Sequence, residues 1–114
     1  MRLPGSGGGC DIACLAPRTV IILAQERHRF VERVSYVTSP GVNVSRVVTT
    51  TSVFGSDGGE LVLERVHPGH TVDEVRDLCG WELRVAAGVA ETEPPTGAEL
   101  AAMRAYDPAG VWRS

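Results

Sequence analysis

Lysine is absent from this chain of 114 residues, and all 11 of its basic residues are arginine. Acidic residues outnumber them at 14, which gives a formal net charge of -3. Proteins that bind nucleic acids usually carry a clustered basic surface. The charge balance therefore argues against a nucleic-acid partner.

The chain also lacks long apolar runs and paired cysteines. Its longest apolar run, Thr19 to Ala24, has the length of a strand and is far too short to cross a bilayer. The N-terminus lacks the apolar core of a secretory signal peptide. The three cysteines, Cys10, Cys14 and Cys79, include no C-x2-C pair, which argues against a disulfide framework. These absences predict a cytoplasmic protein with no membrane partner.

Short apolar segments separated by turn residues predict an α/β protein. We expect a partial open sheet with short helices and one β-hairpin. Capping patterns at Thr71 and Thr96 predict helix starts. The expected helices are 10–15, 71–79 and 96–106; the expected strands are 19–24, 46–54, 60–66 and 81–87. A turn is expected at 38–41, a linker at 91–95, and either a short helix or an ordered loop at 25–34.

The strand Thr19–Ala24 is apolar throughout, without the alternation of a half-exposed strand. This pattern predicts burial on both faces, as in a parallel sheet. The chain offers only short helices to cover those faces. We therefore expect it to associate with a second copy or another subunit rather than to remain a monomer.

The glycine-rich stretch near the N-terminus is the main candidate for a binding site. Glycine allows a ligand to approach the backbone closely, and a following helix offers free N–H groups. Asp11 is expected in the first turn of that helix. The stretch is not a P-loop, because no Gly-Lys-Ser/Thr follows, and it does not fit G-x-G-x-x-G, because Cys10 replaces the third glycine. A flexible leader therefore remains an alternative. The stretch consists of Gly5, Ser6, Gly7, Gly8 and Gly9.

Other polar residues give weaker signals. His67 and His70 flank a Pro-Gly turn without the spacing of a zinc site. His28 lies between two arginines and fits either an anionic substrate or a solvated face. Cys10 and Cys14 are expected to be small buried residues. Four glutamates have a carboxylate that could act as a nucleophile, but their neighbouring residues do not distinguish them from any other glutamate. They are Glu26, Glu32, Glu60 and Glu64.

Three stretches resemble, in order, the C-terminal half of the beta subunit of family I CoA-transferases. They read LPGSGGGCDIACLAPRTVIIL, RFVERVSYVTSPG and VVTTTSVFGSDGGELVLERVHPGHTVDEVRDLCGWEL. The resemblance runs from about Leu3 to Leu83 and is nearest to the glutaconate CoA-transferase beta-subunit group. That group includes the beta subunit of a CoA-transferase-like ring hydrolase of steroid degradation.

The resemblance implies a single domain over residues 1–114 that acts with an alpha-type subunit or a second copy. It implies that the Gly5–Gly9 stretch holds the substrate and polarises its carbonyl, and that Asp11, which matches the Asp after the family's glycine loop, also binds substrate. Coenzyme A would enter as part of an acyl-CoA substrate, with no permanently bound cofactor and no metal. Family enzymes attack the thioester with a glutamate from a short motif that this chain lacks, so no nucleophile is assigned here.

Two alternatives stay open at this point. One is the beta subunit of a hydrolase that opens a cyclic CoA thioester on the same scaffold. The other is a non-catalytic interaction module that keeps the fold.

Overall fold

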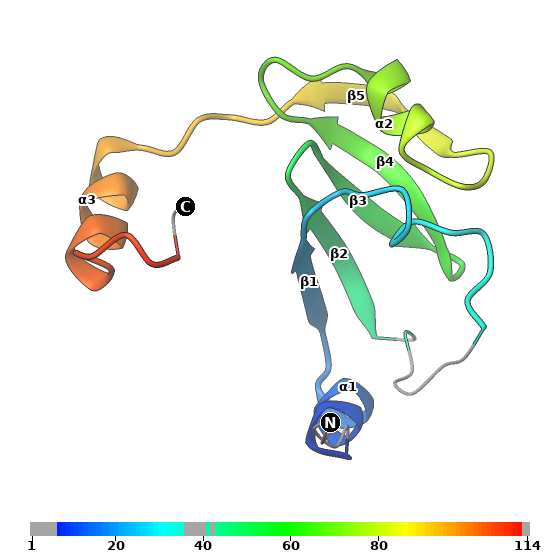
Figure 1. The fold of residues 1–114 in the computed structure, drawn as a ribbon, viewed down its shortest axis with the longest axis horizontal. Coiled ribbons are helices and arrows are strands. Elements are labelled where there is room, and N and C mark those ends of the chain that lie inside the picture. The colour runs from blue at the N-terminus through cyan, green and yellow to red at the C-terminus, as the bar shows by residue number, and fades with distance from the viewer. Residues whose placement is uncertain (1–6, 36–40, 42, 113–114) are drawn as a thin grey trace.

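A computed structural model describes residues 7–35, 41 and 43–112 of the chain. Its helices and strands follow one another as Figure 1 shows. In chain order they are α1 (Gly7–Leu15), β1 (Thr19–Leu23), β2 (Val44–Thr49), β3 (Ser52–Asp57), β4 (Glu60–Val66), α2 (Val72–Asp77), β5 (Arg84–Glu91) and α3 (Gly97–Tyr106). The turn expected at 38–41 lies largely outside the described residues.

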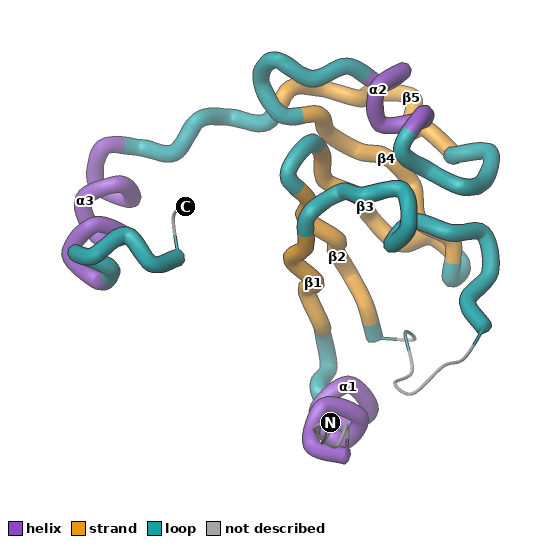
Figure 2. The backbone as a smooth tube through the Cα atoms, viewed as in Figure 1, coloured by secondary structure: helices purple, strands orange, loops and turns teal. Residues whose placement is uncertain are grey.

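The strands form one open sheet in the order β1-β2-β3-β4-β5. The outer pairs, β1 with β2 and β4 with β5, are parallel. The inner pairs, β2 with β3 and β3 with β4, are antiparallel. This mixed sheet with short helices confirms the expected α/β class (Figure 2).

The expectation of a single hairpin was wrong, because the predicted strand Arg46–Phe54 is broken in the middle. Its two parts belong to β2 and β3, which pair as a second hairpin. The Thr49 hydroxyl accepts hydrogen bonds from the backbone N–H groups of Thr51 (3.1 Å) and Ser52 (3.0 Å). Such local side-chain bonds offer the backbone an alternative to the ladder, and here they form the turn.

The hairpin between β3 and β4 confirms the sequence prediction. Asp57 pairs with Glu60 across a two-residue turn. Both turn residues have positive φ, 60° at Gly58 and 85° at Gly59. Two-residue hairpin turns of this kind require left-handed backbone at both central positions, which glycine adopts without steric cost.

The two predicted capping patterns have different outcomes. Thr96 and Glu99 form the complete reciprocal box at the start of α3. Thr71 caps α2 by accepting from the Glu74 N–H, but the Glu74 carboxylate instead accepts from His70 at 2.9 Å. That hydrogen bond lowers the pKa of Glu74. Helix α2 ends at Asp77, two residues earlier than predicted.

Strand β1 is parallel to β2, as predicted, but it is not buried on both faces. It is the edge strand of the sheet, and Val20, Ile21 and Ile22 are exposed, Ile22 at 80%. The apolar run therefore marks a surface that no other described part of the chain covers. Strand β5 starts at Arg84 rather than at 81, because Trp81 and Leu83 pack against the core before it begins.

The hydrophobic core lies on one face of the sheet, under the ordered loop 25–34 and α2. Phe30 from the loop packs on Phe54 of β3 with ring centroids 5.7 Å apart. The loop contains a turn rather than the alternative helix. The buried apolar residues are Phe30, Val47, Phe54, Leu63, Val75, Cys79 and Leu83. Helix α3 contributes nothing to this core.

Of the helices described, none combines the length and apolar character needed to cross a membrane.

We predict that Gly80→Ala destabilises the fold by about 1–3 kcal/mol through overpacking. The Gly80 N–H donates to the Phe30 carbonyl at 2.7 Å, and an added Cβ would lie 2.9 Å from that oxygen and 3.2 Å from the Val31 Cα. These neighbours are backbone atoms, which cannot rotate away. Urea denaturation measures the effect. Gly88→Ala is the matched control, because a Cβ there meets nothing within 4 Å. Equal stabilities for the two variants would contradict the prediction.

Candidate functional site

The glycine stretch is helical over the part that the structure describes. Gly7, Gly8 and Gly9 form the first turn of α1, whereas Gly5 and Ser6 lie outside the described residues. The helix begins three residues earlier than predicted. Asp11 therefore lies beyond the first turn, which contains no acidic residue, and the prediction for it was wrong. Its side chain is exposed.

The C-terminal end of α1 is attached to the start of β2. The Asn43 side-chain amide donates to the carbonyls of Ala13 at 3.0 Å and Cys14 at 3.2 Å. These carbonyls belong to the last turn of α1, where backbone C=O groups have no hydrogen-bond partner within the helix. Asn43 thus holds the helix against the sheet from outside it. The N–H groups of the first turn remain the part of α1 suited to an anion or a polarised carbonyl.

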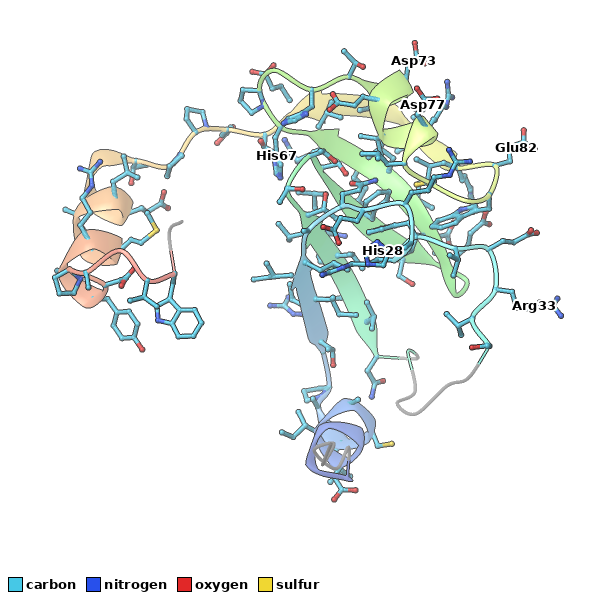
Figure 3. All side chains as sticks on the ribbon, viewed as in Figure 1. His28, Arg33, His67, Asp73, Asp77 and Glu82 are labelled. Carbon is cyan, nitrogen blue, oxygen red and sulfur yellow. The ribbon has the colours of Figure 1, made fainter. Side chains whose placement is uncertain are left out.

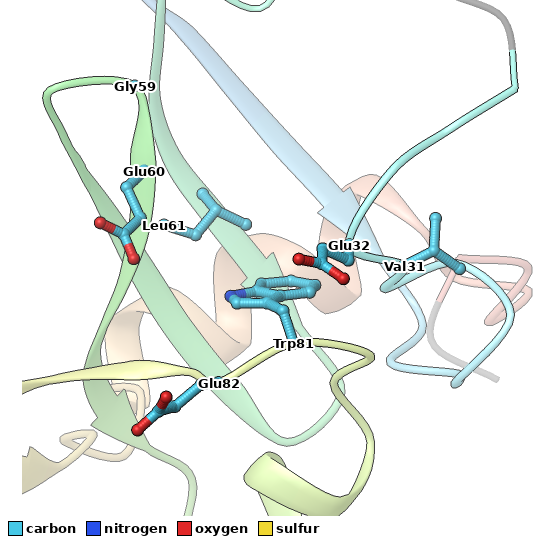
Figure 4. Close-up of a pocket in the computed structure, with 7 residues that line it drawn as sticks. All are labelled: Val31, Glu32, Gly59, Glu60, Leu61, Trp81 and Glu82. Carbon is cyan, nitrogen blue, oxygen red and sulfur yellow. The ribbon is translucent and has the colours of Figure 1, made fainter.

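A second candidate is an open hollow of about 460 Å³ around Trp81 (Figure 4). The tip of the β3–β4 hairpin, the loop 25–34 and the segment before β5 contribute its walls. It brings together Glu32 and Glu60, two of the glutamates considered from the sequence, with Glu82. Its lining residues are Val31, Glu32, Gly59, Glu60, Leu61, Trp81 and Glu82. No sequence pattern distinguished Glu82, since only the fold brings it to the other two.

An apolar hollow of about 210 Å³ adjoins the first and shares Trp81, Val31 and Leu61 with it. Trp81 stacks on Phe30, with centroids 6.3 Å apart and ring planes 15° from parallel. The rest of the wall comes from Ile21, Leu23, Arg29 and Val47. The two hollows therefore meet at one aromatic side chain that also supports the core.

The charges of the larger hollow do not suit an anionic ligand. Its ionisable lining residues are all carboxylates, Glu32, Glu60 and Glu82. Arg84, which does not line the hollow, lies 3.0 Å from Asp57 and 3.8 Å from Glu60. A surface of one charge sign repels ligands of the same sign. The hollow would thus disfavour phosphate or carboxylate groups.

The other two glutamates considered from the sequence, Glu26 and Glu64, form surface ion pairs with arginines. Glu26 lies 2.8 Å from Arg29 and 3.5 Å from His28. Glu64 pairs with Arg46 at 3.0 Å. Figure 3 shows His28, His67 and Glu82 on separate parts of the fold. The structure therefore brings Glu32 and Glu60 together, but neither Glu26 nor Glu64 joins them.

The histidines of the Pro-Gly turn have separate structural partners. His67 is within 2.9 Å of both the Thr92 hydroxyl and the Thr49 carbonyl. His70 binds Glu74. Among the described residues, no three His, Cys, Asp or Glu side chains are arranged to hold a metal ion.

The described cysteines differ in environment. Cys14 is exposed, so the expectation that it is buried was wrong for this residue. Its neighbours Ile12 and Leu15 on α1 are exposed as well. Cys79 is buried, and that burial raises the pKa of its thiol.

A buried polar cluster lies where β1 ends. The Gln25 side-chain carbonyl accepts hydrogen bonds from the hydroxyls of Thr49 (2.8 Å), Thr51 (2.6 Å) and Ser52 (2.8 Å). The Gln25 amide reaches the Cys79 sulfur at 3.9 Å. Because each of these groups has a partner inside the protein, we assign the cluster to fold stability rather than to ligand binding.

Known proteins share both the sequence and the fold of this chain. The chain is 33% identical to the beta subunit of 3-oxoadipate CoA-transferase of Pseudomonas knackmussii, over 94% of this chain and 48% of the relative. It is 29% identical to the beta subunit of glutaconate CoA-transferase of Acidaminococcus fermentans, over 90% and 45%. No family model matches. The chain thus spans about half the length of the curated relatives it matches.

Solved structures give the same result. Glutaconate CoA-transferase from Acidaminococcus fermentans matches with a TM-score of 0.84 and 26% identity, over 100% of this chain and 50% of that one. The decarboxylase AibA/AibB matches with a TM-score of 0.82 and 22% identity, over 97% and 47%, which shows a shared fold alone. The open mixed sheet is therefore the sheet of CoA-transferases. Within that class the chain belongs to family I, where it matches the beta subunit, as the sequence motifs predicted.

We predict that Gln25→Met destabilises the protein by about 2–4 kcal/mol. Methionine keeps the approximate volume but removes the acceptor shared by three buried hydroxyls, and each buried group left without a partner costs about 1–3 kcal/mol. Thermal and urea unfolding measure the change. Ser56→Ala, at an exposed position on the neighbouring β3, should shift stability by less than about 0.5 kcal/mol. A Gln25→Met protein as stable as Ser56→Ala would show that the cluster does not anchor the fold.

Proposed function

We propose that this chain is the C-terminal half of the beta subunit of a CoA-transferase, folded as a single domain over residues 1–114. The enzyme would move coenzyme A from an acyl-CoA thioester to a free carboxylic acid. The observation that carries the proposal is the 33% identity to a CoA-transferase beta subunit over 94% of this chain. The structural match to glutaconate CoA-transferase supports it independently.

The reaction needs a carboxylate nucleophile but no permanently bound cofactor. A glutamate carboxylate attacks the thioester carbonyl, the C–S bond breaks, and the thiolate of CoA leaves an acyl-glutamyl anhydride. The thiolate then attacks the glutamyl carbonyl, which releases the first acid and leaves CoA on the enzyme. The acceptor acid reverses these steps. Coenzyme A thus enters and leaves as part of the substrates.

We assign that nucleophile to a part of the enzyme outside this chain. The three glutamates that the fold gathers, Glu32, Glu60 and Glu82, line an open hollow whose shared negative charge disfavours an anionic acyl-CoA. Glu26 and Glu64 are engaged in ion pairs. None of the five belongs to the glutamate motif of the family.

The contribution of this chain would be the glycine stretch. The N–H groups at the start of α1 would polarise the thioester carbonyl and stabilise the oxyanion that forms on attack. Because glycine has no Cβ, the space in front of these N–H groups stays open for the substrate. We propose this role for Gly5, Ser6, Gly7, Gly8 and Gly9, and we place Asp11, beyond the first turn, in the same substrate-binding site.

The partner would be an alpha-type subunit, because both curated relatives are the beta-type subunits of their enzymes. We place the enzyme in the cytoplasm, a proposal that the free thiols of Cys14 and Cys79 support. The alternative of a ring-opening hydrolase is not favoured, because both curated relatives are transferases. A non-catalytic module would give no CoA exchange even when it is assembled with the other parts of the enzyme.

The isolated chain should not transfer CoA, because it lacks the nucleophile. Purified chain, supplied with acetyl-CoA and either glutaconate or 3-oxoadipate, should form no new acyl-CoA in a chromatographic assay. The chain assembled with an alpha-type subunit and the remaining half of the beta subunit should form it. Assembly without this chain is the control. A thioester trapped on a glutamate of this chain, or no exchange by the assembled enzyme, would contradict the proposal.

Gly8→Val should lower the kcat/KM of the assembled enzyme by about a hundredfold, the cost when the substrate can no longer reach one oxyanion donor. Gly8 lies in a helical turn, so valine keeps an ordinary backbone conformation and acts mainly by filling the substrate's space. Gly88→Val, in strand β5 with open space around its Cβ position, should leave turnover unchanged. Unchanged kcat with a lowered melting temperature in Gly8→Val would mean that the stretch is only structural.

A further inference from the structure

The C-terminal arm, residues 92–112, leaves the sheet at one edge and ends beyond the other. It follows β5, and Figure 1 shows it carrying α3 to the side of the sheet on which β1 lies. Pro94 and Pro95 favour an extended, stiff linker. Helix α3 contains no buried residue, so packing on its own sheet does not hold it there.

The end of the arm is nevertheless ordered. The Asp107 carboxylate accepts hydrogen bonds from the backbone N–H groups of Val111 at 2.9 Å and Trp112 at 3.0 Å. Gly110 has a φ of 71°, and its N–H donates to the Asp107 carbonyl at 3.1 Å. This closed turn leaves Tyr106 and Trp112 exposed at 86% and 83%. Aromatic side chains held in this way are typical anchors of protein interfaces.

The edge strand β1 presents a second apolar surface on the same side. Ile22, Val20 and Ile21 are exposed on it, and Ile12 and Leu15 of α1 are exposed beside its N-terminal end. Within the described residues, no strand pairs with the outer edge of β1. Open edges with apolar side chains recruit a further strand.

The matched relatives contain enough further chain to cover both surfaces. The solved glutaconate CoA-transferase structure matches this chain from end to end, arm included, and about as much chain again remains unmatched there. The 3-oxoadipate relative leaves 52% of its length unmatched, since 48% is covered. A body of that size can cover an open sheet edge and a projecting helix together.

We propose that β1 and the C-terminal arm together hold the other half of the beta subunit. A strand of that half extends the sheet at β1, and Tyr106 and Trp112 pack on it from the arm. The inference rests on the proposed function and adds a defined docking surface to it. This surface serves the assembly of the two halves, whereas the glycine stretch serves the reaction.

Fluorine NMR of this chain labelled with 5-fluorotryptophan tests the proposal. The chain has two tryptophans, Trp81 and Trp112, and Trp81→Phe assigns their signals. The probe is the unlabelled part of the Pseudomonas knackmussii 3-oxoadipate CoA-transferase beta subunit that this chain does not match. We expect a one-to-one complex in which the Trp112 signal shifts and loses its solvent isotope effect. The Trp81 signal should change little.

Three variants locate the contact. Tyr106→Ser on the arm and Ile22→Lys on β1 should each raise the Kd for the added half at least about tenfold, as expected for interface anchors. Val34→Ser is the control. Val34 lies at the end of the loop 25–34 and is exposed at 54%, so this variant should bind the added half as the parent chain does. Circular dichroism melts check that all three variants fold.

Several outcomes would overturn the proposal. They are absence of a complex, a complex in which Trp112 stays exposed, and unchanged binding by Tyr106→Ser and Ile22→Lys. Burial of Trp112 that depends on the concentration of this chain alone would assign the surface to a second copy. CoA exchange by the assembled enzyme with Trp112 exposed overturns the docking proposal alone. Burial of Trp112 without exchange overturns the proposed function alone.

Discussion

The side-chain carbonyl of Gln25 is the contact on which the arrangement of this fold depends. One buried oxygen accepts hydrogen bonds from the hydroxyls of Thr49, Thr51 and Ser52. It thereby fixes the end of β1 to the turn between β2 and β3. The loop that starts at Gln25 then carries Phe30 into the core, where it meets Phe54 and Trp81. A buried polar group costs free energy unless it is paired, so this cluster specifies one arrangement of the chain.

That arrangement separates the chemistry of the chain from its assembly surfaces. Asn43 attaches α1 to the sheet and so positions the N–H groups of the glycine turn. The three gathered carboxylates lie around Trp81, at the tip of the β3–β4 hairpin. Edge strand β1 and helix α3 expose apolar side chains outside that hairpin tip, among them Ile22, Met103 and Tyr106. A division of this kind suits a chain that contributes binding groups to an active site completed by other polypeptide.

Features controlled by neighbouring residues could be predicted directly from the sequence. The Gly58-Gly59 turn needs left-handed backbone at two positions, and the Thr96–Glu99 box closes within one helical turn. The three family motifs were also sufficient to identify a CoA-transferase beta subunit. The break after Thr49 could not be predicted in this way. A run of valine and threonine predicts one strand. The strand ends at Thr49 because its hydroxyl accepts a hydrogen bond from the Thr51 N–H and donates one to the Gln25 side chain.

The sequence by itself thus determined the α/β class, the β3–β4 hairpin, the capped helix α3 and the family, because each depends on local chemistry or on motifs in order. Only the tertiary structure decided that β1 is an exposed edge. An apolar run indicates that a strand is covered, but it does not indicate which part of the protein or which partner covers it. Tertiary structure likewise gathered Glu32, Glu60 and Glu82, which are far apart in the chain. Their proximity depends on strand order and loop packing, and neither can be recognised from the residues that neighbour each glutamate in the sequence.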